Sequence, residues 1–323
     1  MHFYSRKLKL IKGDASFRKF YRIKSKKNSS IIVYSNKEKK KNLLIYDAVN
    51  KLLVSNRITA PKLYSHNYKK NYLEIEDFGS ISIYHKLKKN KKILNQIKLF
   101  KKVINLLNKI QRIKQKKIKN FLNQNYKIKN YTNKKLLSET SLFLEWYIPK
   151  VINKKKRKKL INKLRVIFVK LLSKLKNSNN TFVHRDFHVS NLMYYKKKIG
   201  VIDTQDSVYG NIAYDLASLV DDVRYKTSKK LKEKIYNEFI TSKKINSKNF
   251  KNDFEILSVL RNLKIIGIFT RLSIRDKKDN YLKLIPYAWK LIELRINKNS
   301  NFNELKLTLD NYFSKKIRRS KWE

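Results

Sequence analysis

The sequence HRDFHVSN at His184–Asn191 is followed, after a short aromatic and basic stretch, by IGVID at Ile199–Asp203. The spacing lets the Asp186 carboxylate face one side of a loop while the Asn191 amide turns back toward the other. Asp203 ends an apolar run that is typical of a strand following a short hairpin. We therefore expect these three side chains to converge on one cleft.

The first of these segments matches the pattern H-R-D-x-x-x-x-N, which is the catalytic loop of kinases. In that chemistry the Asp accepts the proton of the acceptor hydroxyl and the Asn holds magnesium. Carboxylate and amide oxygens are ligands that Mg²⁺ prefers beside substrate phosphates. The pattern predicts Asp186 as the catalytic base, Asn191 and Asp203 as Mg²⁺ ligands, and ATP as the phosphoryl donor.

Acidic residues are scarce in this chain, with 24 Asp and Glu against 79 Lys and Arg. Their clustering is therefore informative, because loops elsewhere use Lys and Asn. Six of them fall within fewer than forty positions: Asp186, Asp203, Asp206, Asp215, Asp221 and Asp222. The clustering favours a functional site over an ordinary solvated loop. We expect His184 and Arg185 to brace the loop structurally, and we expect His184 not to act as a base.

The N-terminal eighty residues indicate a small sheet with one helix. Ser16–Ile23 and Ser30–Tyr34 are short apolar runs separated by a polar turn, as in a hairpin. Asn42–Val54 has apolar residues at helical spacing, and Tyr72–Glu76 returns to a strand pattern. After Gly79 the chain becomes helical.

Long amphipathic helices are predicted in the remainder, with apolar faces around residues 93–107 and 160–175 and further helices over 249–270 and 281–294. The helical period stops between residues 181 and 214. The Lys- and Asn-rich stretch 114–133 is interpreted as solvated helix ends and loops. The predicted fold is α+β and two-lobed, like that of protein kinases, with a nucleotide-binding lobe at 1–79 and a helical lobe at 80–323.

Cysteine is absent, which excludes disulfides, thiolate metal sites and cysteine nucleophiles and fits a reducing compartment. No stretch approaches the roughly 20 uncharged residues that a membrane span requires. We therefore expect a cytoplasmic protein that has no membrane association and no obligate protein partner.

The net charge of +55 suggests polyanion binding at first sight. However, the lysines are spread along the whole chain and accompany abundant Asn, Ile and Tyr, the residues of A/T-rich codons. Drift in genome composition explains this bias more simply than selection for a binding surface, because dedicated binders concentrate their charge. We expect nucleic-acid binding to be non-specific at most.

The catalytic-loop segment, together with Asp203, resembles the aminoglycoside/choline phosphotransferase superfamily. Further segments resemble a narrower branch, the bacterial N-acetylmuramate/N-acetylglucosamine kinases of cell-wall recycling, which phosphorylate the anomeric hydroxyl of an amino sugar. These segments are Gly13–Arg18, Leu144–Tyr147, Val201–Asp206, Tyr214–Leu219 and Arg261–Gly267. The resemblance extends, with gaps, from about Gly13 to Trp289.

The resemblance implies nucleotide contacts at two places. One is the loop over the ATP phosphates, with Gly13, Asp14, Ala15, Ser16 and Arg18 as its members. The other is the hinge at residues 74–77, with Glu76 and Asp77, whose backbone would meet adenine.

One departure from the kinase pattern concerns the third strand, where kinases place a lysine that pairs with the phosphates. The corresponding run of this chain presents Tyr34 instead. Either a nearby residue such as Lys37 or Arg18 supplies the cation, or the phosphates rely on backbone and metal. A degenerate, inactive kinase fold is the minority alternative.

The candidate residues for the sugar are Glu145, Trp146, Asp206, Tyr209 and Arg224. An indole face suits a pyranose ring and carboxylates accept hydrogen bonds from hydroxyls. The alternatives are that Trp146 is a core aromatic and that Arg224 forms a salt bridge with Asp221 or Asp222.

The predicted function is therefore ATP- and Mg²⁺-dependent transfer of a phosphoryl group to a sugar hydroxyl. One rival is a kinase for another small alcohol, of the aminoglycoside, choline or homoserine type. A rival from another class is a basic RNA-binding protein on an inactive kinase fold. The intact Asp186, Asn191 and Asp203 argue against this last alternative.

Overall fold

The computed structural model describes residues 8–11, 18–24, 28–243, 245–297 and 299–320. The predicted phosphate-loop residues Gly13, Asp14, Ala15 and Ser16 lie outside these ranges. By internal packing the chain forms two compact units, one of residues 1–129 with 184–208, the other of residues 130–183 with 209–323. The segment that carries the catalytic loop thus packs with the N-terminal part of the chain. The predicted boundary between two lobes at residue 79 stays a prediction.

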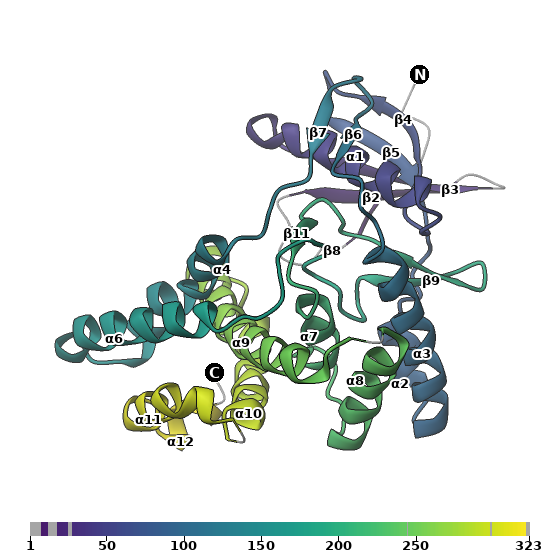
Figure 1. Ribbon diagram of the computed structural model, residues 1–323. Helices are drawn as coiled ribbons and strands as arrows, with labels where there is room; N and C mark the ends of the chain where they lie inside the picture. The colour runs from purple at the N-terminus through teal and green to yellow at the C-terminus, as the bar shows by residue number, and fades with distance from the viewer. Residues whose placement is uncertain (1–7, 12–17, 25–27, 244, 298, 321–323) are drawn as a thin grey trace. The chain divides into compact units, whose positions relative to one another are not determined.

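The first unit is built on a five-stranded antiparallel sheet in the order β1-β2-β3-β5-β4 (Figure 1). Its strands are β1 (Leu8–Ile11), β2 (Lys19–Lys24), β3 (Ser29–Tyr34), β4 (Leu63–Asn67) and β5 (Tyr72–Glu76). Helix α1 (Lys41–Ser55) lies against this sheet. The predicted small sheet with one helix is confirmed.

The core under α1 follows from the period of two in β3 and β5. Ile31 and Val33 alternate on β3 with residues of the opposite sheet face, and Leu73 and Ile75 do the same on β5. Together they pack against the buried face of α1, which contributes Leu43 and Tyr46. Because β3 and β5 are paired, one sheet face is continuously apolar and seats the helix.

The first unit continues with α2 (Ile83–Lys89), α3 (Ile93–Ile110) and the hairpin of β6 (Lys117–Lys119) and β7 (Asn125–Lys127). This hairpin corrects the interpretation of residues 114–133 as solvated helix ends and loops. Phe121 lies in the turn between β6 and β7. It packs against the core under α1 and stacks on His66, with 4.2 Å between the ring centroids. Phe121 therefore helps to anchor a segment whose Lys-rich composition gives no sign of a packed hairpin.

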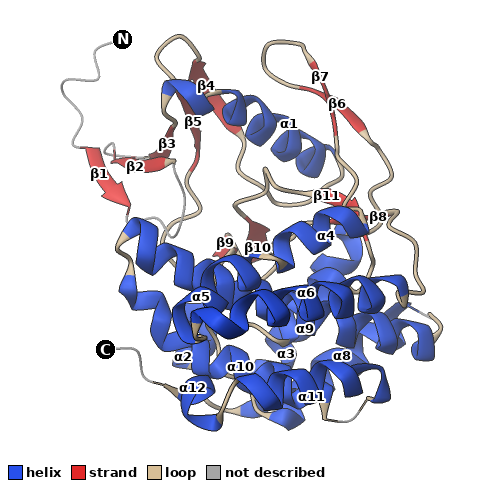
Figure 2. Ribbon diagram, turned by 90° about the vertical axis from the view of Figure 1, so that its left-hand side faces the viewer, coloured by secondary structure: helices blue, strands red, loops and turns tan. Residues whose placement is uncertain are grey.

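The second unit is mostly helical (Figure 2). Its helices of eight residues or more are α4 (Asn133–Thr140), α6 (Lys154–Ser173), α8 (Lys229–Lys243), α9 (Ser247–Asp276), α10 (Ile285–Ile296) and α11 (Asn303–Tyr312). Shorter ones are α5 (Ile148–Val151), α7 (Tyr214–Val220) and α12 (Lys315–Arg319). The predicted helical character is confirmed. Within the described ranges no helix is both long and apolar enough to cross a membrane.

Helix α9 is largely buried in the second unit. One glycine of this helix lets a neighbouring backbone segment approach closely. At Gly267 an added Cβ would lie 2.3 Å from the backbone carbon of Leu142 and 2.5 Å from the nitrogen of Phe143. The segment Phe143–Tyr147, which forms a π-helical turn, packs there. Only glycine permits this contact, because both opposing atoms belong to the backbone.

Candidate active site

The second half of the catalytic loop is fixed by backbone hydrogen bonds within the first unit. The Asn191 amide donates to the His188 carbonyl at 2.9 Å, and the Ile202 amide donates to the Asn191 carbonyl at 3.1 Å. The Tyr84 amide of α2 donates to the Val189 carbonyl at 3.0 Å. The loop is therefore held between α2 and the strand that leads to Asp203.

The strands that support the loop are β9 (Leu192–Tyr195) and β10 (Lys198–Val201), which form an antiparallel hairpin. Gly200 on β10 faces the Phe78 ring, whose nearest carbon would lie 2.6 Å from an added Cβ. The Val201 amide donates to the Thr59 carbonyl at 2.9 Å. The absence of a side chain at Gly200 thus lets the strand before Asp203 lie close to Phe78 and Thr59.

His184 is buried, and its Nε2 donates to the carbonyl of Ile202 at 3.1 Å. This bond joins the start of the catalytic loop to the residue before Asp203. Arg185 has a positive φ of 74°, and its Nη1 donates to the Asp206 carbonyl at 3.2 Å. Both contacts fit the bracing role expected from the sequence.

Asp186, Asn191 and Asp203 come together in the first unit. The Asn191 Nδ2 donates to the Asp186 carbonyl at 3.1 Å, so the other amide atom, Oδ1, remains the acceptor. The Asp186 charge acts on the pKa of the Asp203 carboxyl. Burial raises the pKa of Asp203, the Arg18 guanidinium lowers it, and the Asp186 carboxylate raises it again; the balance is a raised pKa.

This donor set fits magnesium. The Asp203 carboxylate and the Asn191 amide oxygen are hard oxygen ligands, and a cation bound by them would relieve the repulsion between Asp203 and Asp186. Groups of three or more His, Cys, Asp or Glu suited to a metal do not occur in the described part of the chain. A site of this kind would hold Mg²⁺ with few protein ligands and would leave positions for phosphate oxygens.

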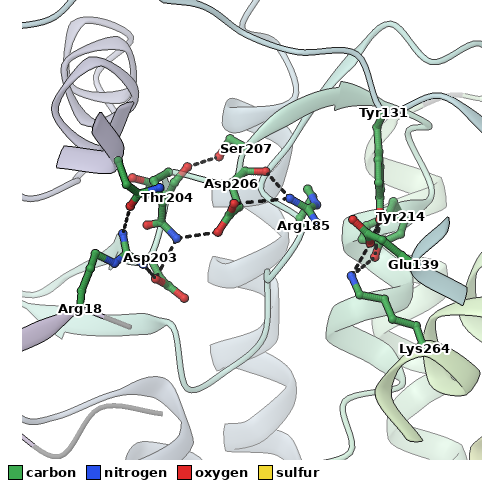
Figure 3. Close-up of polar contacts among 12 residues, drawn as sticks. Arg18, Tyr131, Glu139, Arg185, Asp203, Thr204, Asp206, Ser207, Tyr214 and Lys264 are labelled. Atoms are coloured by element: carbon green, nitrogen blue, oxygen red, sulfur yellow. Dashed lines mark hydrogen bonds and ion pairs between the residues drawn. The ribbon is translucent and has the colours of Figure 1, made fainter. Parts of the chain in front are cut away.

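Arg18 forms an ion pair with Asp203 (Figure 3). Its Nη2 lies 2.8 Å from Asp203 Oδ1, and its Nη1 donates to the side chain of Asn42 at 3.2 Å. The Arg18 residue is 5% exposed. Of the two cations that the sequence offered in place of the missing lysine, the structure brings Arg18 to the site.

The predicted hinge residues are engaged within the protein. The Asp77 carboxylate accepts from Arg22 at 2.6 Å and 2.9 Å, from Ser29 at 2.8 Å and from the Gly79 amide at 2.8 Å. Although burial raises its pKa, these donors outweigh burial, and the pKa of Asp77 is lowered. Glu76 accepts from the Tyr195 hydroxyl at 2.9 Å. Their role toward a nucleotide stays a prediction.

The residues proposed for the sugar are divided between the units. Asp206 belongs to the first, where it accepts from Gln205 at 2.7 Å and lies 3.6 Å from Arg185. In the second unit Glu145 is exposed and Trp146 half-buried, both on the π-helical turn. Tyr209 is fully buried and packs edge-on against Phe182, and its burial raises its pKa to about 12.

Arg224 lies beside Asp222, one of the two acids considered as its salt-bridge partner. Its backbone amide donates to Asp222 Oδ1 at 2.9 Å, and its guanidinium lies 5.9 Å from the centre of the Phe269 ring. Asp221 is bound by Lys232 and Arg295 instead. The sugar contacts of all five residues stay predictions.

Four residues near the site were missed by the sequence analysis: Asn42, Tyr46, Asn50 and Thr204. The first three recur every four residues along α1. This spacing places the three side chains on one face of the helix, a pattern that can be recognised in the sequence. In a chain so rich in Asn and Tyr, however, that signal does not stand out from composition.

Comparison with known proteins agrees with this geometry. The model of the phosphotransferase enzyme family matches residues 7–238, well over half of the chain. The chain belongs to this family. The membership confirms the superfamily resemblance and the prediction of a phosphotransferase.

Relatives within the phosphotransferase enzyme family support the narrower branch. The chain is 26% identical over 281 residues to an N-acetylmuramate/N-acetylglucosamine kinase of Neisseria meningitidis, covering 85% of this chain and 81% of the relative. It is 25% identical to a protein of the same name from Pseudomonas putida, covering 91% and 84%.

Solved structures of other phosphotransferases share the fold. Choline kinase LicA from Streptococcus pneumoniae superposes with a TM-score of 0.60 at 13% identity, covering 89% of this chain and 93% of that one. The ADP-bound aminoglycoside phosphotransferase APH(2'')-Ib gives a TM-score of 0.59 at 13% identity, covering 91% and 94%. The predicted protein-kinase-like fold is thereby confirmed.

Proposed function

We propose that this phosphotransferase transfers the γ-phosphate of ATP to the anomeric hydroxyl of N-acetylmuramate or N-acetylglucosamine. The observation that carries the chemistry is the convergence of Asp186, Asn191 and Asp203, with Arg18 against Asp203. The acceptor class is supported by relatives that cover most of the chain and bear that name. A cytoplasmic location belongs to the same proposal, since ATP is consumed there.

In this mechanism Asp186 accepts the proton of the acceptor hydroxyl as its oxygen attacks the γ-phosphorus. Asn191 Oδ1 and Asp203 would hold Mg²⁺, which, when bound, neutralises charge on the phosphate oxygens. Arg18 adds a positive charge beside Asp203. The protein thus orients the reactants and offsets charge in a loose transition state.

The deciding experiment is a coupled assay of ATP consumption with a panel of N-acetylmuramate, N-acetylglucosamine, choline, homoserine and an aminoglycoside. We expect turnover with the two amino sugars alone. Phosphorus NMR of the product should show phosphate coupled to the anomeric proton. Turnover with choline, homoserine or the aminoglycoside would show that the proposed amino-sugar acceptor is wrong. Phosphate at another ring position would refute the anomeric assignment.

A further inference from the structure

One face of α1 carries polar side chains toward the segment that contains Asp203. Asn42, Tyr46 and Asn50 follow one another at intervals of four, so they form a single stripe along the helix. Tyr46 is 3% and Asn50 4% exposed, although both carry polar atoms. Buried polar groups of this kind are retained where they have partners.

The first end of the stripe holds Arg18. Asn42 accepts a hydrogen bond from Arg18 at 3.2 Å, and the Arg18 guanidinium lies 5.5 Å from the centre of the Tyr46 ring. A second ring, Phe20, lies 5.8 Å from the same guanidinium. Amide and aromatic partners position a guanidinium without neutralising it.

The second end of the stripe holds Thr204. The Thr204 hydroxyl donates to Asn50 Oδ1 at 2.6 Å, and Thr204 is fully buried. The Asn50 side chain also hydrogen-bonds the Tyr46 phenol, although burial dominates and raises the pKa of Tyr46 to about 12. A continuous set of contacts therefore runs from Arg18 through α1 to the residue after Asp203.

Thr204 matters because its neighbour is strained. Asp203 has a φ of +62°, in the left-handed region that non-glycine residues adopt only when the surroundings hold them there. The Thr204 carbonyl also accepts from the Ser207 hydroxyl at 2.6 Å. Anchoring Thr204 on both sides maintains the direction of the Asp203 carboxylate.

The same helix bears no carboxylate toward Arg18. Its one acidic residue, Asp47, lies 3.1 Å from Lys51. The strand β3 has the sequence SSIIVY and no lysine. The cation that pairs with Asp203 is Arg18, the residue before β2, and neutral groups of α1 contact it.

We propose that Asn42, Tyr46, Asn50 and Thr204 are positioning residues that align Arg18 and Asp203 together for Mg²⁺-bound nucleotide. In the structure Arg18 pairs with Asp203; with nucleotide present, the guanidinium turns to a phosphate oxygen while Asp203 turns to the metal. Neutral partners suit that exchange, since no carboxylate of α1 competes with the phosphate. This inference rests on the proposed use of Mg·ATP and is independent of the acceptor.

The test compares Thr204→Val, which removes the hydroxyl with little change of shape, with Thr204→Ser, which keeps it. Calorimetry with a non-hydrolysable ATP analogue and Mg²⁺ should show about tenfold weaker binding for T204V, because a buried acceptor loses its partner. T204S should bind like the parent. In turnover assays T204V should raise the KM for ATP and leave the KM for the sugar unchanged.

A double-variant cycle separates this role from a general loss of stability. Asn50→Ala and Thr204→Val remove the same hydrogen bond, so their effects on nucleotide affinity should not add. Ser55→Ala, which removes an exposed hydroxyl from the end of the same helix, is the matched control and should bind normally. Thermal melting of every variant confirms that the folded protein is compared.

Three results would overturn the inference: unchanged nucleotide affinity in folded T204V, failure of T204S to restore binding, or additive effects of N50A and T204V. A parent protein that binds no Mg²⁺-bound nucleotide would refute the proposed function as well. A parent that binds nucleotide but phosphorylates no amino sugar would refute only the acceptor.

Discussion

Asp203 and Arg185 both have backbone angles in the left-handed region, with φ of 62° and 74°. For a residue with a side chain this conformation costs about 1–2 kcal/mol. Hydrogen bonds around each residue oppose that cost, from His184 to Ile202 and from Arg185 to the Asp206 carbonyl. Strain at these two positions is typical of a site where side-chain direction matters more than local stability.

Asp186 is expected to act on the acceptor and not on the nucleotide. Asp186→Asn keeps the size of the side chain but removes the base, so kcat should fall by about 10²–10⁴. Nucleotide affinity with Mg²⁺ should stay close to that of the parent. Steady-state kinetics and calorimetry on the same preparation measure both quantities. A variant with parental kcat would show that another group is the base.

Asp203 is expected to act on the metal. Asp203→Asn keeps an oxygen but removes the charge, so the gain in nucleotide affinity that Mg²⁺ provides should largely disappear. The measurement is calorimetry of an ATP analogue with and without Mg²⁺. Asp279→Asn is the matched control, because Asp279 is an exposed carboxylate of the second unit. Equal metal dependence in D203N and the parent would contradict the assignment.

Four helices of the second unit meet at one buried carboxylate. Asp221, at the end of α7, is fully buried and lies 3.1 Å from Lys232 of α8 and 2.8 Å from Arg295 of α10. It also accepts from Ser258 of α9. Burial raises its pKa, but the two cations and the hydroxyl outweigh burial, and the pKa of Asp221 is lowered.

This contact has a definite pH dependence. Since the pKa of Asp221 is lower in the folded than in the unfolded chain, its stabilisation is complete above the unfolded value of about 3.9. It is lost as the pH falls through the folded value.

Asp221→Asn should therefore destabilise the second unit by about 3–5 kcal/mol at neutral pH, because two buried cations lose their partner. The stability of the variant should also fall less steeply below pH 4 than that of the parent. Urea unfolding at several pH values measures both effects. The control is Asp276→Asn, which breaks an exposed pair with Arg275 and should change little. Parallel pH profiles of D221N and the parent would exclude this contact as the acid-sensitive one.

At the scale of the whole molecule the outstanding property is the net charge of +55. Many of the basic side chains lie at exposed positions of helices such as α6, whose sequence begins KKKRKK. Diffuse charge of this kind attracts any polyanion through counterion release and recognises no base sequence. It contributes to solubility and carries no information about the reaction.

Binding to nucleic acid should accordingly be weak and independent of sequence. Affinity should fall steeply with salt, with a slope of about 0.9 in log K for each phosphate neutralised. Sugar phosphorylation should continue when nucleic acid is present at physiological salt. Fluorescence anisotropy with several unrelated oligonucleotides over a salt series, beside the kinase assay, measures this. Tight, selective binding together with an absence of kinase activity would favour an RNA-binding protein on an inactive kinase fold.

The sequence by itself determined the local elements and the chemistry-bearing residues. Period-two runs predicted β3 and β5, helical spacing predicted α1, α3 and α9, and the joint spacing of Asp186, Asn191 and Asp203 indicated a kinase. These features depend on residues close together in the chain, and each has a physical period or a fixed spacing. Such signals remain readable even when composition is strongly biased.

Only the tertiary structure decided which cation and which helix face serve the site. Arg18 and Asp203 are separated by 185 positions, and Asn50 and Thr204 by 154. A chain with 79 basic residues offers many cations of equal local character, and only packing selects one of them. The hairpin anchored by Phe121 was hidden for the same reason, because its partner His66 lies far away in sequence. Long-range pairing depends on the packing of the core and leaves no periodic trace in the sequence.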